Sequence, residues 1–116
     1  MNIKKEDKMR GYHKHHIVFR SQGGLDFDLN FAFLTPEQHR ELHDNNHDMD
    51  LKLKKELQEK LFQIFKNDTY TLEEIIEELG LKRKKAEKAF KRVDCIGGEY
   101  QAEKIVKRLM GGRFYF

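Results

Sequence analysis

The six histidines of this 116-residue chain all lie between positions 13 and 47, and this clustering constrains the fold more than any other feature. His15 and His16 are adjacent, while His39 and His43 are separated by three residues. Imidazole has an unperturbed pKa close to neutral pH, and its neutral form is a common ligand of divalent metals. The segment therefore predicts a compact centre in which some imidazoles hold a metal ion and another acts as a base.

The residues around these histidines predict two short strands joined by a loop. Residues 15–19 and 31–34 are rich in β-branched and aromatic side chains, which favour strands. The intervening residues 20–30 contain Ser, a Gly pair, Asp and Asn, a composition that is typical of a compact loop.

A helix is expected to follow the second strand. Thr35 is a suitable N-cap, Pro36 occupies the first helical position, and Gln38 completes a capping box. The helix is expected to carry three histidines along one face: His39, His43 and His47.

These positions favour a catalytic metal site. Adjacent strand residues point to opposite sides of the strand, so that one of His15 and His16 can face a metal while the other faces a substrate. His39 and His43 project together from a helix and can both bind that metal. Three imidazoles with an open fourth position suit metal-assisted phosphodiester hydrolysis, in which the remaining imidazole deprotonates water.

The rest of the chain predicts helices and turns. A stripe of Leu, Ile and Phe predicts a helix over residues 50–65. Thr71 begins another helix with a second capping box, Gly80 ends it, and residues 82–93 form the next. Two short helices joined by a turn that contains Gly are typical of a helix-turn-helix. A small hairpin or turn and a last short helix, residues 101–110, complete the prediction.

Positive charge is concentrated in residues 82–92, which hold seven Lys or Arg and one Glu, although the whole chain has a net charge of only +3. A charge run is often a solvated helix face, but the apolar opposite face and the preceding turn favour contact with DNA phosphates. The side chains expected to make these contacts are Lys82, Arg83, Lys84, Lys85 and Lys88.

Composition narrows the class of protein. Nine Phe and four Tyr provide enough apolar mass for a folded chain although 37% of the residues are charged. Cys95 is the only cysteine, which excludes an intrachain disulfide and a Cys-based zinc site. There is no apolar leader or membrane-length run, so a cytoplasmic protein is expected, located in the host cell if a phage encodes it.

Residues 15–43 resemble the HNH endonuclease motif, the ββα-metal finger, in the form found in colicin and pyocin nuclease domains. The shared elements are, in order, His15-His16, Ser21-Gln22-Gly23-Gly24, Asn30, Thr35-Pro36 and His39-x3-His43. Residue types, order and spacing all agree over this segment, which is about a quarter of the chain.

The resemblance implies a set of metal ligands that consists of His15, His39 and His43. It also implies that His16 is the general base, that Asn30 holds the loop and helps to orient the base, and that Arg20 faces phosphate. The implied cofactor is one divalent ion, with Mg²⁺ or Mn²⁺ for turnover and with Zn²⁺ or Ni²⁺ also able to bind.

The chain departs from the family pattern in three ways. The Cys-x2-Cys pairs of many HNH proteins are absent, so that the helix over residues 50–65 has to brace the finger. His13 occupies a position where the toxin nucleases have Glu. Three roles of His13 stay open: it takes part in catalysis, it binds the metal, or it has no part in the site. Many other members have Asp in place of His15 and coordinate the metal through the Asn, which leaves the role of Asn30 open.

The sequence therefore predicts a small, mostly helical α+β chain with three parts. These are an HNH finger over residues 1–48, a linking helix over 49–67 and a helix-turn-helix module over 68–116. Residues 68–111 loosely resemble excisionase-like modules. The expected function is metal-dependent hydrolysis of double-stranded DNA by an enzyme of phage or mobile-element type. Its candidate partners are DNA, a second copy of the chain, and phage packaging or replication proteins.

Two other functions are compatible with the same residues. The finger could be a structural metal site in a DNA-binding protein that does not cleave, although such a site has no need of the extra imidazole of His16. An RNA-directed or non-specific toxin nuclease is the third reading, and no signal peptide or receptor domain in the sequence supports it.

Overall fold

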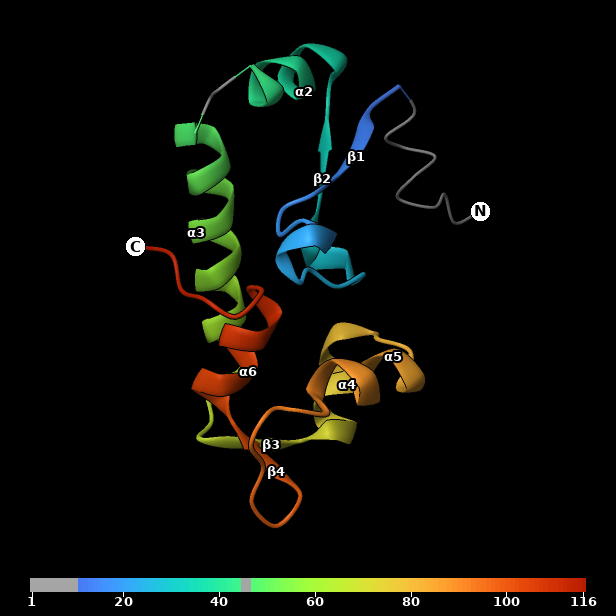
Figure 1. The fold of residues 1–116 in the computed structure, drawn as a ribbon, viewed down its shortest axis with the longest axis vertical. Helices are drawn as coiled ribbons and strands as arrows, with labels where there is room; N and C mark the ends of the chain where they lie inside the picture. The colour runs from blue at the N-terminus through green and yellow to red at the C-terminus, as the bar shows by residue number, and fades with distance from the viewer. Residues whose placement is uncertain (1–10, 45–46) are drawn as a thin grey trace.

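The computed structural model describes residues 11–44 and 47–116, with the side chain of His43 outside the description. The predicted finger boundary at residue 1 also lies outside the described residues. Within these ranges the chain is a small α+β protein with five α-helices and two two-stranded antiparallel sheets (Figure 1). No helix in the described ranges has the length and apolarity needed to cross a bilayer.

The N-terminal part is a ββα unit. Strand β1 (His13–His16) pairs antiparallel with β2 (Phe31–Leu34), and helix α2 (Pro36–His43) follows directly. The capping box predicted at the start of α2 is confirmed: Thr35 Oγ1 accepts from the Gln38 amide at 3.1 Å, and Gln38 Oε1 accepts from the Thr35 amide at 3.0 Å. The helix packs on both strands.

Residues 17–30, here called the finger loop, connect the two strands. The strand predicted over residues 15–19 instead spans His13–His16, because Ile17 and Val18 turn into the protein core and are buried. Two 3₁₀ turns, Arg20–Gln22 and Asp28–Asn30, give the finger loop its compact shape.

The expected placement of three histidines on one helix is wrong. Helix α2 ends at His43 with Asp44 as its C-cap, and His47 is the first residue of α3 (His47–Ile64). Asp and Asn compete with the backbone for hydrogen bonds and disfavour helix interiors, so the Asp44-Asn-Asn sequence is a poor continuation of α2. His47 is exposed, as predicted for a histidine outside the site.

The C-terminal part alternates short strands and helices. Its elements are β3 (Thr69–Thr71), α4 (Leu72–Leu79), α5 (Arg83–Phe90), β4 (Glu99–Gln101) and α6 (Ala102–Leu109). Strands β3 and β4 pair antiparallel, an arrangement absent from the prediction. The predicted capping box of α4 is confirmed, and Gly80 ends α4 in the left-handed conformation.

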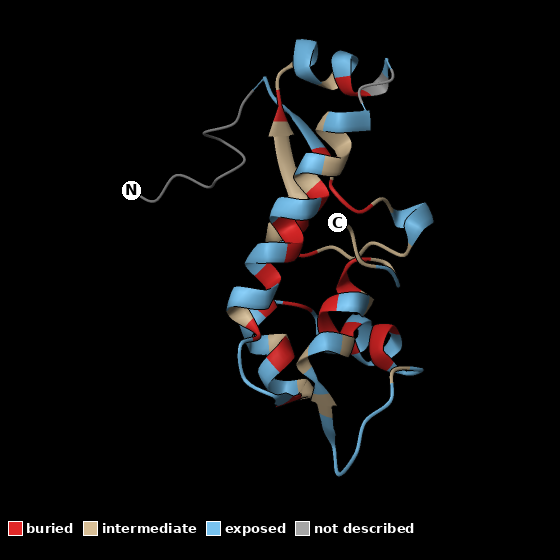
Figure 2. Cartoon of the chain, turned by 90° about the vertical axis from the view of Figure 1, so that its left-hand side faces the viewer, coloured by how far each residue is buried: buried red, intermediate tan, exposed pale blue. Residues whose placement is uncertain are grey.

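One hydrophobic cluster joins the two parts. It extends from Ile17, Val18 and Phe27 of the finger loop to the inner faces of α3 and of the helices that follow. Buried positions recur along α3 and in the helices of the C-terminal part (Figure 2). The finger loop therefore lies on the C-terminal part and is not a separate appendage.

Helix α3 also contributes a buried cation to this contact. The Lys54 side chain is only 1% exposed, and its Nζ lies 2.6 and 2.7 Å from the two carboxylate oxygens of Asp50. The same ammonium lies 4.8 Å from the ring centre of Phe19 in the finger loop and 5.7 Å from that of Tyr115. An ion pair and aromatic faces thus compensate for the burial of this charge.

Candidate active site

Asn30 fixes the backbone of the finger loop. Its side chain is fully buried, and its Oδ1 accepts a hydrogen bond from the Val18 amide at 2.8 Å. Its Nδ2 donates to the carbonyls of Val18 at 3.1 Å and Leu25 at 2.8 Å. Both polar ends of the amide are therefore engaged with backbone, which favours a role for Asn30 in holding the loop over a role as a metal ligand.

The Gly pair is required by close backbone contacts. A Cβ atom on Gly24 would lie 1.8 Å from the Val18 carbonyl oxygen, a distance that no side chain can occupy. Gly23 has φ +87°, in the left-handed region that favours glycine, and ends the first 3₁₀ turn. The Ser-Gln-Gly-Gly sequence thus produces a loop that is tightly folded against its own start.

His15 and His16 face opposite sides of β1, as strand alternation predicts. The His15 side is buried: the residue is 6% exposed, and its ring centre lies 5.3 Å from that of Phe19 and 5.8 Å from that of His39. The His16 ring packs edge-on against Phe31 at 4.7 Å, on the side of the finger loop. The His15 imidazole therefore lies beside α2 and Phe19, and the His16 imidazole lies on the other side of β1, against Phe31.

The imidazole cluster beside α2 includes His13 as well as the predicted ligands. Nδ1 of His13 lies 2.9 Å from Nδ1 of His39, and the two ring centres are 4.9 Å apart. Two imidazole nitrogens bound to one tetrahedral ion at about 2.0–2.1 Å would be about 3.3 Å apart, so this pair is close to the spacing of shared ligands.

The full predicted ligand set cannot be assembled from the described side chains. Among them, no group of three or more His, Cys, Asp or Glu is arranged to hold a metal ion. His15 and His39 are close together, but the third predicted ligand, His43, lies at the end of α2 and its side chain is outside the description. The ligand set thus stays a prediction, and His13 becomes a further candidate.

The opposite imidazole, His16, is bound to a carboxylate. Nε2 of His16 lies 2.8 Å from Oδ1 of Asp26 in the finger loop. The other carboxylate oxygen accepts from Arg20 at 2.9 Å and lies 3.5 Å from Nζ of Lys85 on α5. The hydrogen bond with His16 lowers the pKa of the Asp26 carboxyl most, and the nearby charges of Arg20 and Lys85 lower it further.

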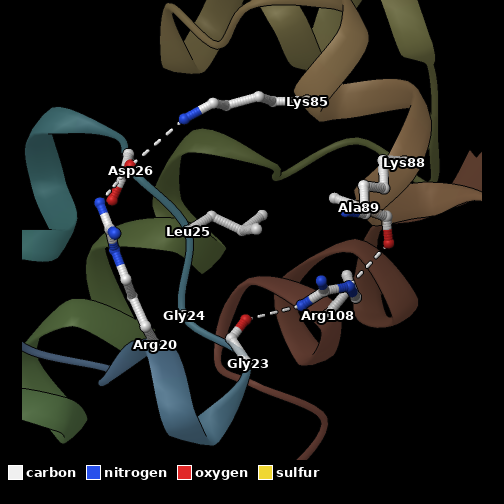
Figure 3. Close-up of a pocket in the computed structure, with 9 residues that line it drawn as sticks. All are labelled: Arg20, Gly23, Gly24, Leu25, Asp26, Lys85, Lys88, Ala89 and Arg108. Atoms are coloured by element: carbon white, nitrogen blue, oxygen red, sulfur yellow. Dashed lines mark hydrogen bonds and ion pairs between the residues drawn. The ribbon is translucent and has the colours of Figure 1, made fainter.

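A pocket of about 510 Å³ lies between the finger loop and α5, and we call it the basic pocket (Figure 3). Four cationic side chains from three parts of the chain line it: Arg20, Lys85, Lys88 and Arg108. Asp26 lies at its edge, between Arg20 and Lys85 (Figure 3). The pocket therefore combines positive charge with direct access to the carboxylate that contacts His16.

Arg108 of α6 joins the two walls of this pocket. Its Nε donates to the Ala89 carbonyl of α5 at 2.7 Å, and an Nη donates to the Gly23 carbonyl of the finger loop at 2.9 Å (Figure 3). Its partial burial lowers the pKa of the guanidinium through desolvation. Arg108 thus serves as a clamp, and Lys85 and Lys88 are the more accessible cations.

The predicted DNA-binding residues in α5 and at its N-cap, Lys82, divide into three groups. Lys85 and Lys88 line the basic pocket, whereas Lys82 and Lys84 are exposed elsewhere on the surface. Arg83 is paired with Glu73 of α4, and this pairing lowers the pKa of the glutamate. Only part of the basic run thus faces the finger.

Sequence reasoning missed Asp26 and Arg108. Asp26 is one of the polar residues of the predicted loop, and because no regular helix or strand connects it to His16, no periodicity in the sequence links the two residues. Arg108 lies 85 residues from Gly23, and its only signal was a cation in the last turn of a helix. The contacts of Asp26 with His16 and of Arg108 with Gly23 both depend on the folded path of the finger loop.

Comparison of this chain with models of known protein families, with curated proteins and with solved structures finds no match.

Proposed function

We propose that the protein is a metal-dependent endonuclease of the HNH type that hydrolyses phosphodiester bonds in double-stranded DNA. The observation that carries the proposal is the opposed pair of imidazoles on β1. His15 is directed towards His39 of α2, while His16 is bound to the edge of the basic pocket through Asp26. A single ββα unit thus offers candidate metal ligands on one side and a candidate base on the other.

The residues that would hold the metal are His15, His39 and His43, and His13 is a further candidate ligand. Neutral imidazoles suit Zn²⁺ and Ni²⁺, and Mg²⁺ or Mn²⁺ would enter the same site more weakly. When bound, a divalent ion would neutralise charge on the phosphate and stabilise the leaving 3′-oxygen.

In this proposal His16 acts as the general base. Its side chain is 25% exposed, so that a water molecule can reach the ring, and its Nε2 is already engaged by Asp26. The second ring nitrogen, Nδ1, is then the atom that would take a proton from the attacking water.

The basic pocket supports the choice of nucleic acid as substrate. Lys85 and Lys88 come from α5, and Arg20 comes from the finger loop, yet all three line one pocket. A phosphate backbone held by α5 would therefore pass the loop that contacts His16. Lysine and arginine contacts to phosphate provide affinity without base specificity, which fits a nuclease that positions its substrate by the backbone.

A plasmid-cleavage assay tests the proposal. Wild type, His16→Ala and the control His47→Ala, which alters an exposed histidine outside the site, are treated with EDTA and then supplied with Mg²⁺, Mn²⁺, Ni²⁺ or Zn²⁺. We expect metal-dependent cleavage that His47→Ala retains and that His16→Ala loses by about 10²–10⁴-fold, the usual contribution of a general base. DNA binding without cleavage under every metal would contradict the proposal and favour a structural metal finger.

A further inference from the structure

The carboxylate of Asp26 lies between the candidate base and two cations. One oxygen, Oδ1, is 2.8 Å from His16 Nε2, and the other, Oδ2, is 2.9 Å from Arg20 and 3.5 Å from Lys85. We propose that Asp26 is a positioning residue that holds the His16 ring with its proton on Nε2 and its lone pair on Nδ1. This inference rests on the proposed function, because it assigns a role in the same site.

The partners of Asp26 fix which ring nitrogen carries the proton. An ionised carboxylate only accepts hydrogen bonds, so His16 Nε2 must be the donor. In a neutral imidazole the other nitrogen, Nδ1, is then an acceptor and can take a proton from water. The edge-on contact with Phe31 at 4.7 Å holds the ring plane in addition.

The two cations make the orientation of this carboxylate specific. Arg20 and Lys85 carry donors only, and both approach Oδ2, which leaves Oδ1 to His16. The two oxygens therefore have separate partners. Since Lys85 belongs to α5, the C-terminal part of the chain contributes directly to the orientation of the base.

This division of partners predicts the effect of an amide at position 26. In Asp26→Asn the carbonyl oxygen will face Arg20 and Lys85, because these side chains offer only donors. The amide NH₂ will then face His16 and donate to Nε2, which forces the ring proton onto Nδ1 and removes the acceptor for water. A tautomer of this kind in a histidine base costs on the order of 10⁴-fold in kcat, so a loss of about 10²–10⁴-fold is expected.

Truncation should be less harmful than the isosteric change. Asp26→Ala leaves no group that enforces the wrong tautomer, and the neutral His16 ring can still adopt the productive one. We expect freer ring motion in Asp26→Ala to lower the cleavage rate, but by less than the wrong tautomer imposed in Asp26→Asn. A residue with a merely structural role would show the opposite order, because Asn preserves shape and Ala does not.

The experiment compares wild type, Asp26→Asn, Asp26→Ala and the control Asp28→Asn, which alters an exposed carboxylate two residues away. Single-turnover cleavage and DNA affinity are measured with Mg²⁺ or Mn²⁺, and circular dichroism checks the fold of each variant. We expect the cleavage rate to fall most in Asp26→Asn and not at all in Asp28→Asn. DNA affinity should stay equal or rise, because Arg20 and Lys85 lose a competing anion.

A second readout does not depend on activity. With ¹⁵N-labelled histidine at about pH 8, where an ordinary imidazole is neutral, the ring nitrogen shifts report the tautomer of each histidine. The His16 signals are those missing from His16→Ala. We expect the Nε2–H form in wild type and the Nδ1–H form in Asp26→Asn, in metal-free protein without DNA.

The outcomes separate this inference from the proposed function. An unchanged tautomer in Asp26→Asn, or wild-type cleavage by this variant, would overturn the role of Asp26 even if the protein is a nuclease. A wild type that cleaves no DNA would refute the nuclease proposal, while the nitrogen shifts would still decide whether Asp26 sets the tautomer of His16.

Discussion

Replacing Asn30 with Ala should strongly destabilise the fold of the finger loop. The buried amide makes three hydrogen bonds, to the Val18 amide, the Val18 carbonyl and the Leu25 carbonyl. A buried backbone group that loses its partner costs about 1–3 kcal/mol. The Leu25 contact is only partly buried, so water can replace that partner, and the two Val18 contacts then dominate. We expect a loss of about 3–5 kcal/mol in the free energy of unfolding.

Urea denaturation followed by circular dichroism measures this loss, with Asn67→Ala as a control for an exposed asparagine. The control should change the free energy of unfolding by less than about 0.5 kcal/mol. Asn30→Asp should not rescue stability, because its second oxygen would face the carbonyls of Val18 and Leu25 where the amide nitrogen now donates. A loss of less than about 1 kcal/mol in Asn30→Ala would show that this side chain does not hold the finger loop.

Two further predictions concern charge. Replacing Lys85 and Lys88 with Gln should weaken DNA binding. The slope of log affinity against log salt should become shallower by about 1.8, because each lost phosphate contact removes about 0.9. Fluorescence anisotropy over a series of salt concentrations measures this slope. The exposed Lys60→Gln should leave the slope unchanged, and an equal change in both would argue against the basic pocket. Because its partners lower the folded-state pKa of Asp26 below the ordinary value of 3.8, the stability from Asp26 is present above that value and lost as pH falls below it. The stability difference between wild type and Asp26→Asn should therefore shrink in acid unfolding below about pH 4, and a constant difference would contradict this sign.

Local signals in the sequence predicted the helix boundaries that depend on local chemistry. The capping boxes at Thr35 and Thr71 begin α2 and α4, and Gly80 ends α4, because each of these features is satisfied within a few residues. The opposed directions of His15 and His16 also follow from strand geometry alone. These features needed no knowledge of how distant parts of the chain meet.

The local spacing of residue types does not predict contacts between distant parts of the chain. Strands β3 and β4 have three residues each, too few for a clear alternation, and they pair across a long separation in sequence, with Tyr70 opposite Tyr100. The contact of Asp26 with His16 depends on the folded path of the finger loop. The prediction that His47 shares a helix face with His39 and His43 is wrong, because the four-residue spacing continues in the sequence although α2 ends at His43.

The clamp formed by Arg108 has a consequence for the order of assembly during synthesis. The finger loop and the guanidinium that binds the Gly23 carbonyl are 85 residues apart, so β1 and α2 leave the ribosome long before α6 can reach them. Gly111, just after α6, packs closely on the same loop, since a Cβ atom there would lie 2.1 Å from the Gln22 carbonyl oxygen. A nascent chain that already contains all six histidines therefore still lacks one wall of the basic pocket, and any chemistry at this site has to wait until α6 has been synthesised and has docked on the finger loop.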